Sequence, residues 1–305
     1  MRLFVNILVS AVALSAQAFD SAAWLGRRAA LDSEASRLRA AYAKCAAEAT
    51  EPAEGLTIPF ESHPDGSVKA SVAAARAQLF LADGLVWGEG VKVRQFRADG
   101  SEEARIDAEN CVVDRKSRSG WVDAHASARY RDEAELEGDG VFFSSGDEYV
   151  SVTSNTVLRA DGKVLKAARA DYDRKEGVAM FDGGVELRGE QDGHGYVLSA
   201  DQAFVFLSGT NQFRRVVALG GVAVSSDGRV GTCARAVYTK RDAMVVMHGD
   251  GAGAPARLVD AGSRRSEVEG ARITFWLDSE QVEVVDSKVS VDSGAAGLPG
   301  GRGAR

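Results

Sequence analysis

The sequence predicts an all-β fold, an elongated β-jellyroll of repeats preceded by a short N-terminal helix. Beyond Pro59, short runs of Val, Phe and Tyr alternate with Asp-Gly, Gly-Asp and Gly-Gly turns, as between the strands of hairpins. A motif of small residues returns at a nearly regular interval as far as about Val291. Helical spacing of apolar residues is confined to a segment before this region.

The chain begins with the pattern of a secretory signal peptide, MRLFVNILVSAVALSAQAFD. Arg2 precedes an apolar run of 14 residues from Leu3 to Ala16, and Ala16-Gln17-Ala18 supplies small residues at the positions that a signal peptidase reads. The run is shorter than the roughly 20 residues that span a bilayer. We therefore predict that residues 1–18 are removed by cleavage after Ala18 and that the protein is exported. An uncleaved membrane anchor is the alternative.

Residues 19–55 are predicted to form a helical segment. Leu31, Leu38, Tyr42 and Cys45 recur at helical spacing, with Arg and Glu on the other faces. The helix should stop before Pro52. We expect it to pack on, or cap, the β region that follows.

The repeat has the form Ala-x-x-Ala-x-apolar. The copies that begin at Ala167, Ala200, Cys233 and Val268 are separated by 33, 33 and 35 residues. Several copies are followed by Gly-Val, as at Gly221-Val222. Such repetition predicts units of short strands that bury their apolar faces only by stacking on one another. The copies are Ala74/Ala77/Leu79, Ala108/Cys111/Val113, Ala167/Ala170/Tyr172, Ala200/Ala203/Val205, Cys233/Ala236/Tyr238 and Val268/Ala271/Ile273.

The spacing within the motif predicts a bend in each strand. In a flat strand, residues i and i+3 point to opposite faces. A β-bulge between them adds one residue and brings both to the same face. The two intervening residues, such as Asp201 and Gln202, should then lie at the bend and face solvent.

Composition limits the classes of partner. The net charge is −7 and no basic block is present, so nucleic acid is not expected as a partner. The three cysteines, Cys45, Cys111 and Cys233, form no CxxC and no disulfide framework. Cys111 and Cys233 stand where other repeats carry Ala, which favours small buried side chains, and a bridge between these two stays open.

The repeats resemble a known family. The run from Ser199 to Val205, SADQAFV, leading to ALGGVAV at Ala218 to Val224, resembles the OstA-like repeat of the lipopolysaccharide transport proteins LptA, LptC and the periplasmic domain of LptD. Tyr172 and Tyr238 stand at the aromatic position of that repeat. The resemblance is best from about Lys163 to Val291. The part from Ile58 to Arg159 is more similar to an LptC-type domain.

This resemblance implies a division into two modules. Residues 56–165 would form a first OstA/LptC-like β module and residues 166–292 a second OstA/LptA-like β module. Residues 293–305, rich in Gly and without an apolar pattern, are expected to be a disordered tail. The family further implies a location in the periplasm.

No catalytic constellation is found in the sequence, and we predict a protein that is not an enzyme. His63, His125, His194 and His248 are scattered without metal-ligand spacing, so no metal site is expected. Nucleophile and nucleotide-binding motifs are missing as well, and no cofactor is expected. The alternating carboxylates from Glu133 to Asp139 are interpreted as the solvent face of a strand.

The resemblance implies that the protein carries or bridges lipopolysaccharide, or a similar lipid, on its way to the outer membrane, with the acyl chains shielded in an apolar trough. Other transport-bridge β-jellyroll proteins would join by pairing of edge strands. The alternatives are a structural scaffold with a closed core and no ligand, and a β-helix enzyme that acts on polysaccharide. The candidate lining consists of apolar positions expected to point inward, namely Leu79, Val91, Val93, Val113, Tyr172, Val185, Leu187, Val205, Leu207, Val222, Val224, Tyr238, Ile273 and Phe275.

The first prediction concerns export. The mature protein should begin at Phe19 and fractionate with soluble periplasmic proteins, because Ala16 and Ala18 fit the peptidase site. N-terminal sequencing of the protein recovered from cells measures this directly. Recovery of the full-length chain in the membrane fraction would instead indicate an anchor.

Overall fold

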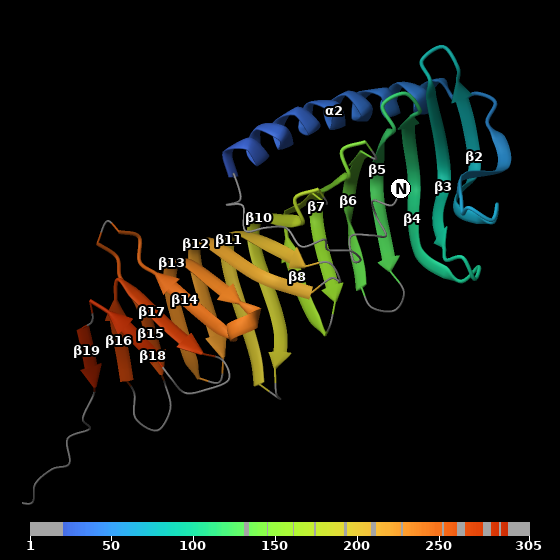
Figure 1. Ribbon diagram of the computed structural model, residues 1–305. Coiled ribbons are helices and arrows are strands. Elements are labelled where there is room, and N and C mark those ends of the chain that lie inside the picture. Colours follow the sequence, from blue (N-terminus) through green and yellow to red (C-terminus); the bar gives the residue numbers. More distant parts are fainter. Residues whose placement is uncertain are drawn as a thin grey trace, which may run out of the picture.

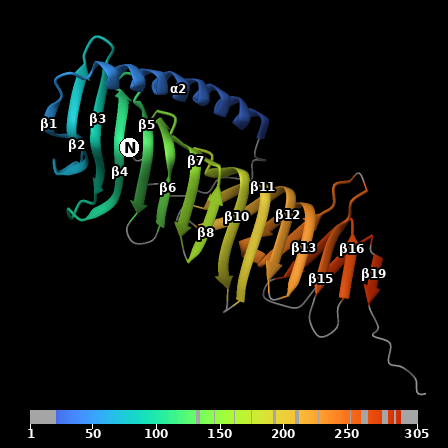
Figure 2. The same ribbon diagram turned by 180° about the vertical axis from the view of Figure 1, so that it is seen from behind.

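A long helix lies along an elongated stack of strands in the computed structural model (Figure 1; Figure 2 shows the same arrangement from behind). The structure describes residues 21–130, 134–144, 146–160, 162–173, 175–191, 194–208, 212–226, 228–251, 253–260, 266–276, 282–286 and 288–291. The predicted signal peptide and C-terminal tail lie outside these residues. No helix within the described ranges has the length and apolar character needed to cross a bilayer.

Nearly all described elements are strands, which confirms the all-β prediction, with one helix before them. The helix α2 spans Ser21–Glu48, close to the range expected from the sequence. A short 3-10 helix, η1, covers Lys240–Asp242. The strands are β1 (Ala53–Ser62), β2 (Val68–Phe80), β3 (Leu85–Phe96), β4 (Glu102–Asp114), β5 (Ser119–Tyr130), β6 (Ala134–Ser144), β7 (Tyr149–Ala160), β8 (Lys163–Ala167), β9 (Arg169–Asp173), β10 (Val178–Gln191), β11 (His194–Ser208), β12 (Gln212–Ser226), β13 (Arg229–Thr239), β14 (Met244–His248), β15 (Ala256–Asp260), β16 (Ser266–Gly270), β17 (Arg272–Trp276), β18 (Val282–Val285) and β19 (Lys288–Val291).

The described strands form one antiparallel sheet in which most strands pair with their neighbours in sequence. The short strands β8 and β9 together fill the place of one strand, since both pair with β7 on one side and β10 on the other. The expected boundary between residues 165 and 166 falls inside β8, where the hydrogen bonding of the sheet is continuous. The division of the chain into two modules therefore stays a prediction.

The bend expected from the small-residue motif is present. Ala200 and Ala203 are both buried, whereas Asp201 between them is exposed. The register of β11 with β12 shifts between Ser199 and Gln202, as a bulge requires. The parity argument from the sequence is therefore confirmed at this copy.

Neighbouring strands bend at the same level because each carries its own irregularity there. The register shifts between Asp182 and Val185 in β10 and between Leu219 and Val222 in β12. Gly183 and Gly220 have φ angles of 80° and 72° at these bends, a conformation that favours glycine. A Cβ on Gly183 would lie 2.6 Å from the Cβ of Ala168, so the bend also needs the missing side chain.

One copy of the motif differs from the expectation. In the last copy Ala271 is exposed, and the neighbouring Gly270 is buried in its place. The bend there is a break between two short strands, β16 and β17, and is not a bulge within one strand. The inward position has moved by one residue at this break, whereas Ala167 and Ala170 are both buried at the break between β8 and β9.

The sheet has two different apolar faces. We call inner face the one that carries both small positions of the motif, and it holds four clusters of buried residues, around Val91, Val185, Val222 and Ile273. The outer face is the opposite one. It carries larger side chains, among them Trp87 and Phe142, over which α2 packs.

The second prediction tests the bend. Ala203→Leu should lower the free energy of unfolding by roughly 1–3 kcal/mol, because Ala203 is 1% exposed and has no room for a larger side chain. Gln202→Leu, on the bend and half-buried, should change it by less than about 0.5 kcal/mol. Urea unfolding of both variants supplies the comparison. Equal losses would show that the two positions are not on opposite sides of the sheet.

Candidate functional site

The inner face holds the candidate lining residues. All but two of the lining residues predicted from the sequence lie within its four clusters or pack against them. The first cluster takes Val91, Val93 and Val113, the second Val185, Leu187, Val205 and Leu207, the third Val222 and Val224, and the fourth Tyr238, Ile273 and Phe275.

Tyr172 and Leu79 belong to none of these clusters. Tyr172 is half-buried in β9, opposite Val150 on one side and Ala179 on the other. Leu79 is 50% exposed, because β1 pairs with β2 no further than Ala77 and leaves the end of β2 uncovered. Both remain predicted lining residues.

Burial along the inner face decreases with distance from the bend. Val185, Val222 and Ile273 are 2%, 1% and 0% exposed, and each lies next to a bend. The residues two positions further along the same strands are Leu187, Val224 and Phe275, and all three are only half-buried. The inner face is thus closed at the bend and accessible to solvent away from it.

Because of this gradient, the inner face presents partly exposed apolar side chains beyond the bends. Half-buried apolar side chains recur on strand after strand, from Val93 on β3 to Phe275 on β17. Such a surface can take up hydrocarbon, since every CH₂ that leaves water contributes about 0.8 kcal/mol. The arrangement supports binding by apolar contact along the length of the stack.

The outer face, in contrast, is covered by α2. The helix buries Leu31, Leu38 and Cys45 against the strands, as the sequence predicted, and Tyr42 packs half-buried beside them. Near its start, the Trp24 ring meets Phe204 of β11 edge-on, with ring centroids 6.0 Å apart. Figure 1 shows the helix running across the strands and not along one of them.

A buried ionic network fixes α2 to β9. Asp171 is 0% exposed and pairs with Arg28 of the helix at 2.8 Å. It also accepts hydrogen bonds from the Tyr149 hydroxyl at 2.7 Å and from Nε of Arg169 at 2.8 Å. Arg169 in turn pairs with Asp32 of the helix. Burial raises the pKa of Tyr149, which keeps its donor proton in place.

A second pair extends this network. Asp173, 1% exposed, lies 2.7 Å from Arg27, which also donates a hydrogen bond to the carbonyl of Asp147 at 2.7 Å. Burial raises the pKa of Asp173. Removing one partner of such a pair leaves a buried charge and costs about 3–5 kcal/mol. The helix is therefore held by directional contacts in addition to apolar packing.

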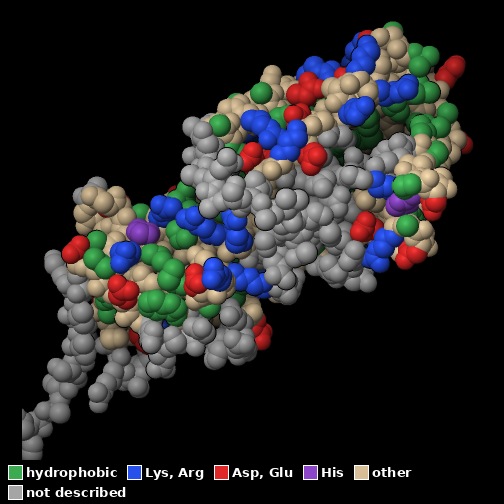
Figure 3. Space-filling view, in the orientation of Figure 1, with side chains coloured by type: hydrophobic (Ala, Val, Ile, Leu, Met, Phe, Trp, Pro, Cys, Tyr) green, Lys and Arg blue, Asp and Glu red, His purple; other side chains and the backbone are tan. Residues whose placement is uncertain are grey.

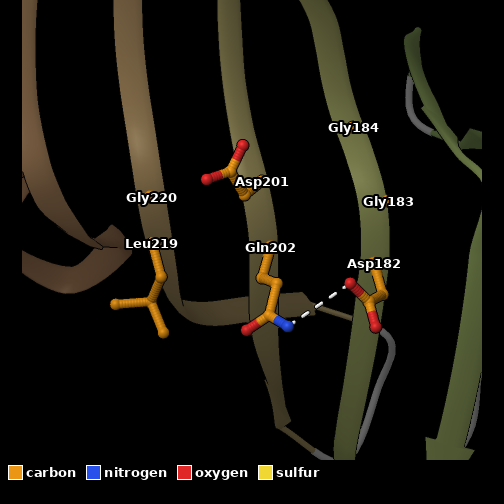
Figure 4. Close-up of a pocket in the computed structure, with 7 residues that line it drawn as sticks. All are labelled: Asp182, Gly183, Gly184, Asp201, Gln202, Leu219 and Gly220. Carbon is orange, nitrogen blue, oxygen red and sulfur yellow. Dashed lines mark hydrogen bonds between the residues drawn. The ribbon is translucent and has the colours of Figure 1, made fainter.

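A small surface depression lies over the bends of β10, β11 and β12 (Figure 4). It is lined by Asp182, Gly183, Gly184, Asp201, Gln202, Leu219 and Gly220, and Nε2 of Gln202 donates to Oδ1 of Asp182 at 3.3 Å. The glycines leave this space because they have no side chains. Asp182, Asp201 and Gln202 stand beside Leu219 in this lining, so it does not offer acyl chains a continuous apolar surface.

The described residues contain no group of three or more His, Cys, Asp or Glu side chains that could hold a metal ion. The alternating carboxylates of β6 form cross-strand pairs, Glu135 with Arg129 and Glu137 with Arg159, both at 3.0 Å. This agrees with their interpretation as a solvent face. Cys45, Cys111 and Cys233 are all unpaired, which answers the question left open for Cys111 and Cys233.

Comparison with known proteins identifies the second half of the chain. Residues 164–281 match the family described as LptA/(LptD N-terminal domain) LPS transport protein. The match confirms the resemblance to the OstA-like lipopolysaccharide transport family and falls within the segment, from about Lys163 to Val291, where the sequence indicated it most clearly.

Among solved structures, the chain is similar to LptH from Pseudomonas aeruginosa, described as the LptA homologous periplasmic component of the conserved lipopolysaccharide transport device. The two sequences are 14% identical, the match covers 39% of this chain and 85% of that chain, and the TM-score is 0.35. No curated protein matches the chain in sequence.

The ionic network under α2 was not found from the sequence. Its signal is the segment Arg169–Asp173, in which Ala170 and Tyr172 alternate with two aspartates. In an isolated sheet this alternation indicates an apolar face and a solvated face. The aspartates are buried because the Arg-bearing side of α2 covers them, and this pairing is not visible in either segment alone.

The third prediction uses the gradient of burial. Val222→Asp should unfold the domain, because a carboxylate at a site 1% exposed has no access to water. Val224→Asp, two residues further from the bend and half-buried, should leave the protein folded with a lower thermal midpoint. Thermal unfolding followed by circular dichroism measures both variants. Equal destabilisation would indicate that the inner face is closed at both positions.

Proposed function

We propose that the protein is a non-enzymatic periplasmic carrier or bridge for lipopolysaccharide or a similar lipid, whose acyl chains lie on the inner face. The observation that carries this proposal is the change from fully buried to half-buried apolar side chains along each strand, as from Val222 to Val224. The match of residues 164–281 to a family of LPS transport proteins supports it.

The physical task explains why such a face would be useful. A lipid with several acyl chains cannot cross an aqueous compartment unshielded, because each exposed CH₂ costs about 0.8 kcal/mol. A face that runs from β3 to β17 offers contact along the whole path. Because the contacts are apolar and lack direction, a chain can slide along the face without breaking specific bonds.

The ends of the sheet are suited to partners of the same architecture. Within the described residues, β1 pairs with β2 alone, and β18 and β19 each pair with one strand. Such edges expose backbone donors and acceptors that another strand can use. We propose that other transport-bridge β-jellyroll proteins pair with these edges. Pro59 in β1 removes one donor there, so pairing at that end would be incomplete.

The fourth prediction tests the proposal directly. A photoreactive side chain at Val224, on the inner face of β12, should crosslink to lipopolysaccharide in living cells. The same group at Leu219 should not, although Leu219 lies on the same strand and is also half-buried. Leu219 packs with the outer-face cluster under α2, which makes it a matched control. The readout is the mass of the lipid attached to the purified protein.

Three outcomes would contradict the carrier role. Crosslinks of equal yield at both positions would mean that lipid adheres to the protein without using the inner face. A folded variant with no crosslink at Val224 would favour a scaffold with a closed core. Release of sugars from a polysaccharide by the purified protein would favour the enzymatic alternative.

A further inference from the structure

On β11, β12 and β13, the inner face ends in half-buried apolar residues at one end of the strands. Val216 of β12 lies opposite Val205 of β11 on one side and Tyr238 of β13 on the other. Leu207 extends the row on β11. Both Val216 and Tyr238 are half-buried, so the row is open to solvent at this end of the strands.

Three exposed cations lie immediately beyond this row. Arg214 precedes Val216 by two residues, and Lys240 and Arg241 begin η1 directly after β13. The pairing of Arg215 with Thr239 places Arg214 and Lys240 next to each other at the ends of adjacent strands. Figure 3 shows Lys and Arg side chains gathered on the molecule in the region of β12 to β14.

These cations differ from most cations on the strands nearby. Arg188, Arg229 and Arg257 each form an ion pair with a carboxylate, at 2.8, 3.1 and 2.6 Å. No carboxylate of the described ranges lies within ion-pair distance of Arg214, Lys240 or Arg241. Asp242 is the one acidic residue in η1. In a protein of net charge −7, a cluster that keeps its positive charge unneutralised is suited to an anion.

Another cation approaches the same row from a strand that does not pair with it. The charge of Lys163, at the start of β8, acts on the Tyr238 hydroxyl and opposes the rise of its pKa that burial causes. β8 pairs with β7 and β10, so this charge acts on Tyr238 from a strand that is not a neighbour of β13 in the sheet. The open end of the row is thus flanked by positive charge on two sides.

We propose that Arg214, Lys240 and Arg241 bind the phosphate groups of an amphiphilic lipid whose acyl chains lie on the adjacent half-buried side chains of Leu207, Val216 and Tyr238. Guanidinium and ammonium groups are the usual partners of phosphate, and Arg presents paired donors to its oxygens. The proposal rests on the carrier role above and adds the orientation of the lipid. Its headgroup would lie between the start of β12 and η1.

The experiment compares the binding of two probes to the purified full-length mature protein, namely lipopolysaccharide with a bisphosphorylated lipid A and the same lipid after enzymatic removal of these phosphates. In the variant R214Q/K240Q/R241Q, affinity for the phosphorylated probe should fall about tenfold or more, as expected for the loss of three exposed charge pairs. Affinity for the dephosphorylated probe should stay unchanged. The loss should shrink at high salt, where exposed charges are screened.

The matched control is R115Q/K116Q/R118Q. It removes the same charge from three exposed cations in the turn between β4 and β5, far from β12 in the sheet. Both probes should bind this control as they bind the wild type. An equal loss in the two variants would show an effect of net charge and overturn the proposed site.

Further outcomes separate this inference from the carrier role. If both probes bind the wild type equally and R214Q/K240Q/R241Q changes neither, the headgroup site is wrong while the carrier role stands. If neither probe binds the folded wild type, the carrier role itself fails. Displacement of the phosphorylated probe by millimolar inorganic pyrophosphate would show that the cations take free phosphate, and would overturn the assignment to a lipid headgroup.

Discussion

The bend of the strands is the constraint on which the rest of the structure depends. A strand that carries Ala200 and Ala203 on one face must contain a bulge between them, because two positions three apart otherwise point in opposite directions. The bend permits only small side chains on its inside and requires glycines such as Gly183 in neighbouring strands. Burial is complete at the bend and partial beyond it, and the open inner face follows from this geometry.

The features of the sheet that could be predicted all follow from the repeat of small residues in the sequence. Periodic small residues gave the all-β fold, the bends and the inward positions, because alternation along a strand is a local property. Leu31, Leu38 and Cys45 likewise identified the buried side of the helix from its spacing alone. At the break between β16 and β17 the small buried residue is Gly270, and the prediction that Ala271 points inward is wrong.

Other features could not be predicted because they depend on two distant segments at once. Asp171 and Asp173 are charged residues at alternate positions, and only the arrival of Arg27 and Arg28 from the helix makes their burial possible. The exposure of Leu79 depends in the same way on where β1 begins, because Ala53 pairs with Ala77. The grouping of Arg214 with Lys240 and Arg241 follows from the pairing of β12 with β13, which brings together residues that are distant in the chain.

The long helix has a mechanical consequence. From Trp24 to Cys45 it rises by about 32 Å at 1.5 Å per residue, which is close to seven strand spacings of about 4.8 Å. Its charged contacts reach from Asp114 on β4 to Asp182 on β10, and so lie on both sides of the interval in which the two modules were expected to meet. A helix attached to the sheet at both of these points braces the strands between them. It resists twisting and hinging of the sheet between these points. The parts of the inner face on either side of residues 165 and 166 therefore stay aligned as one continuous surface.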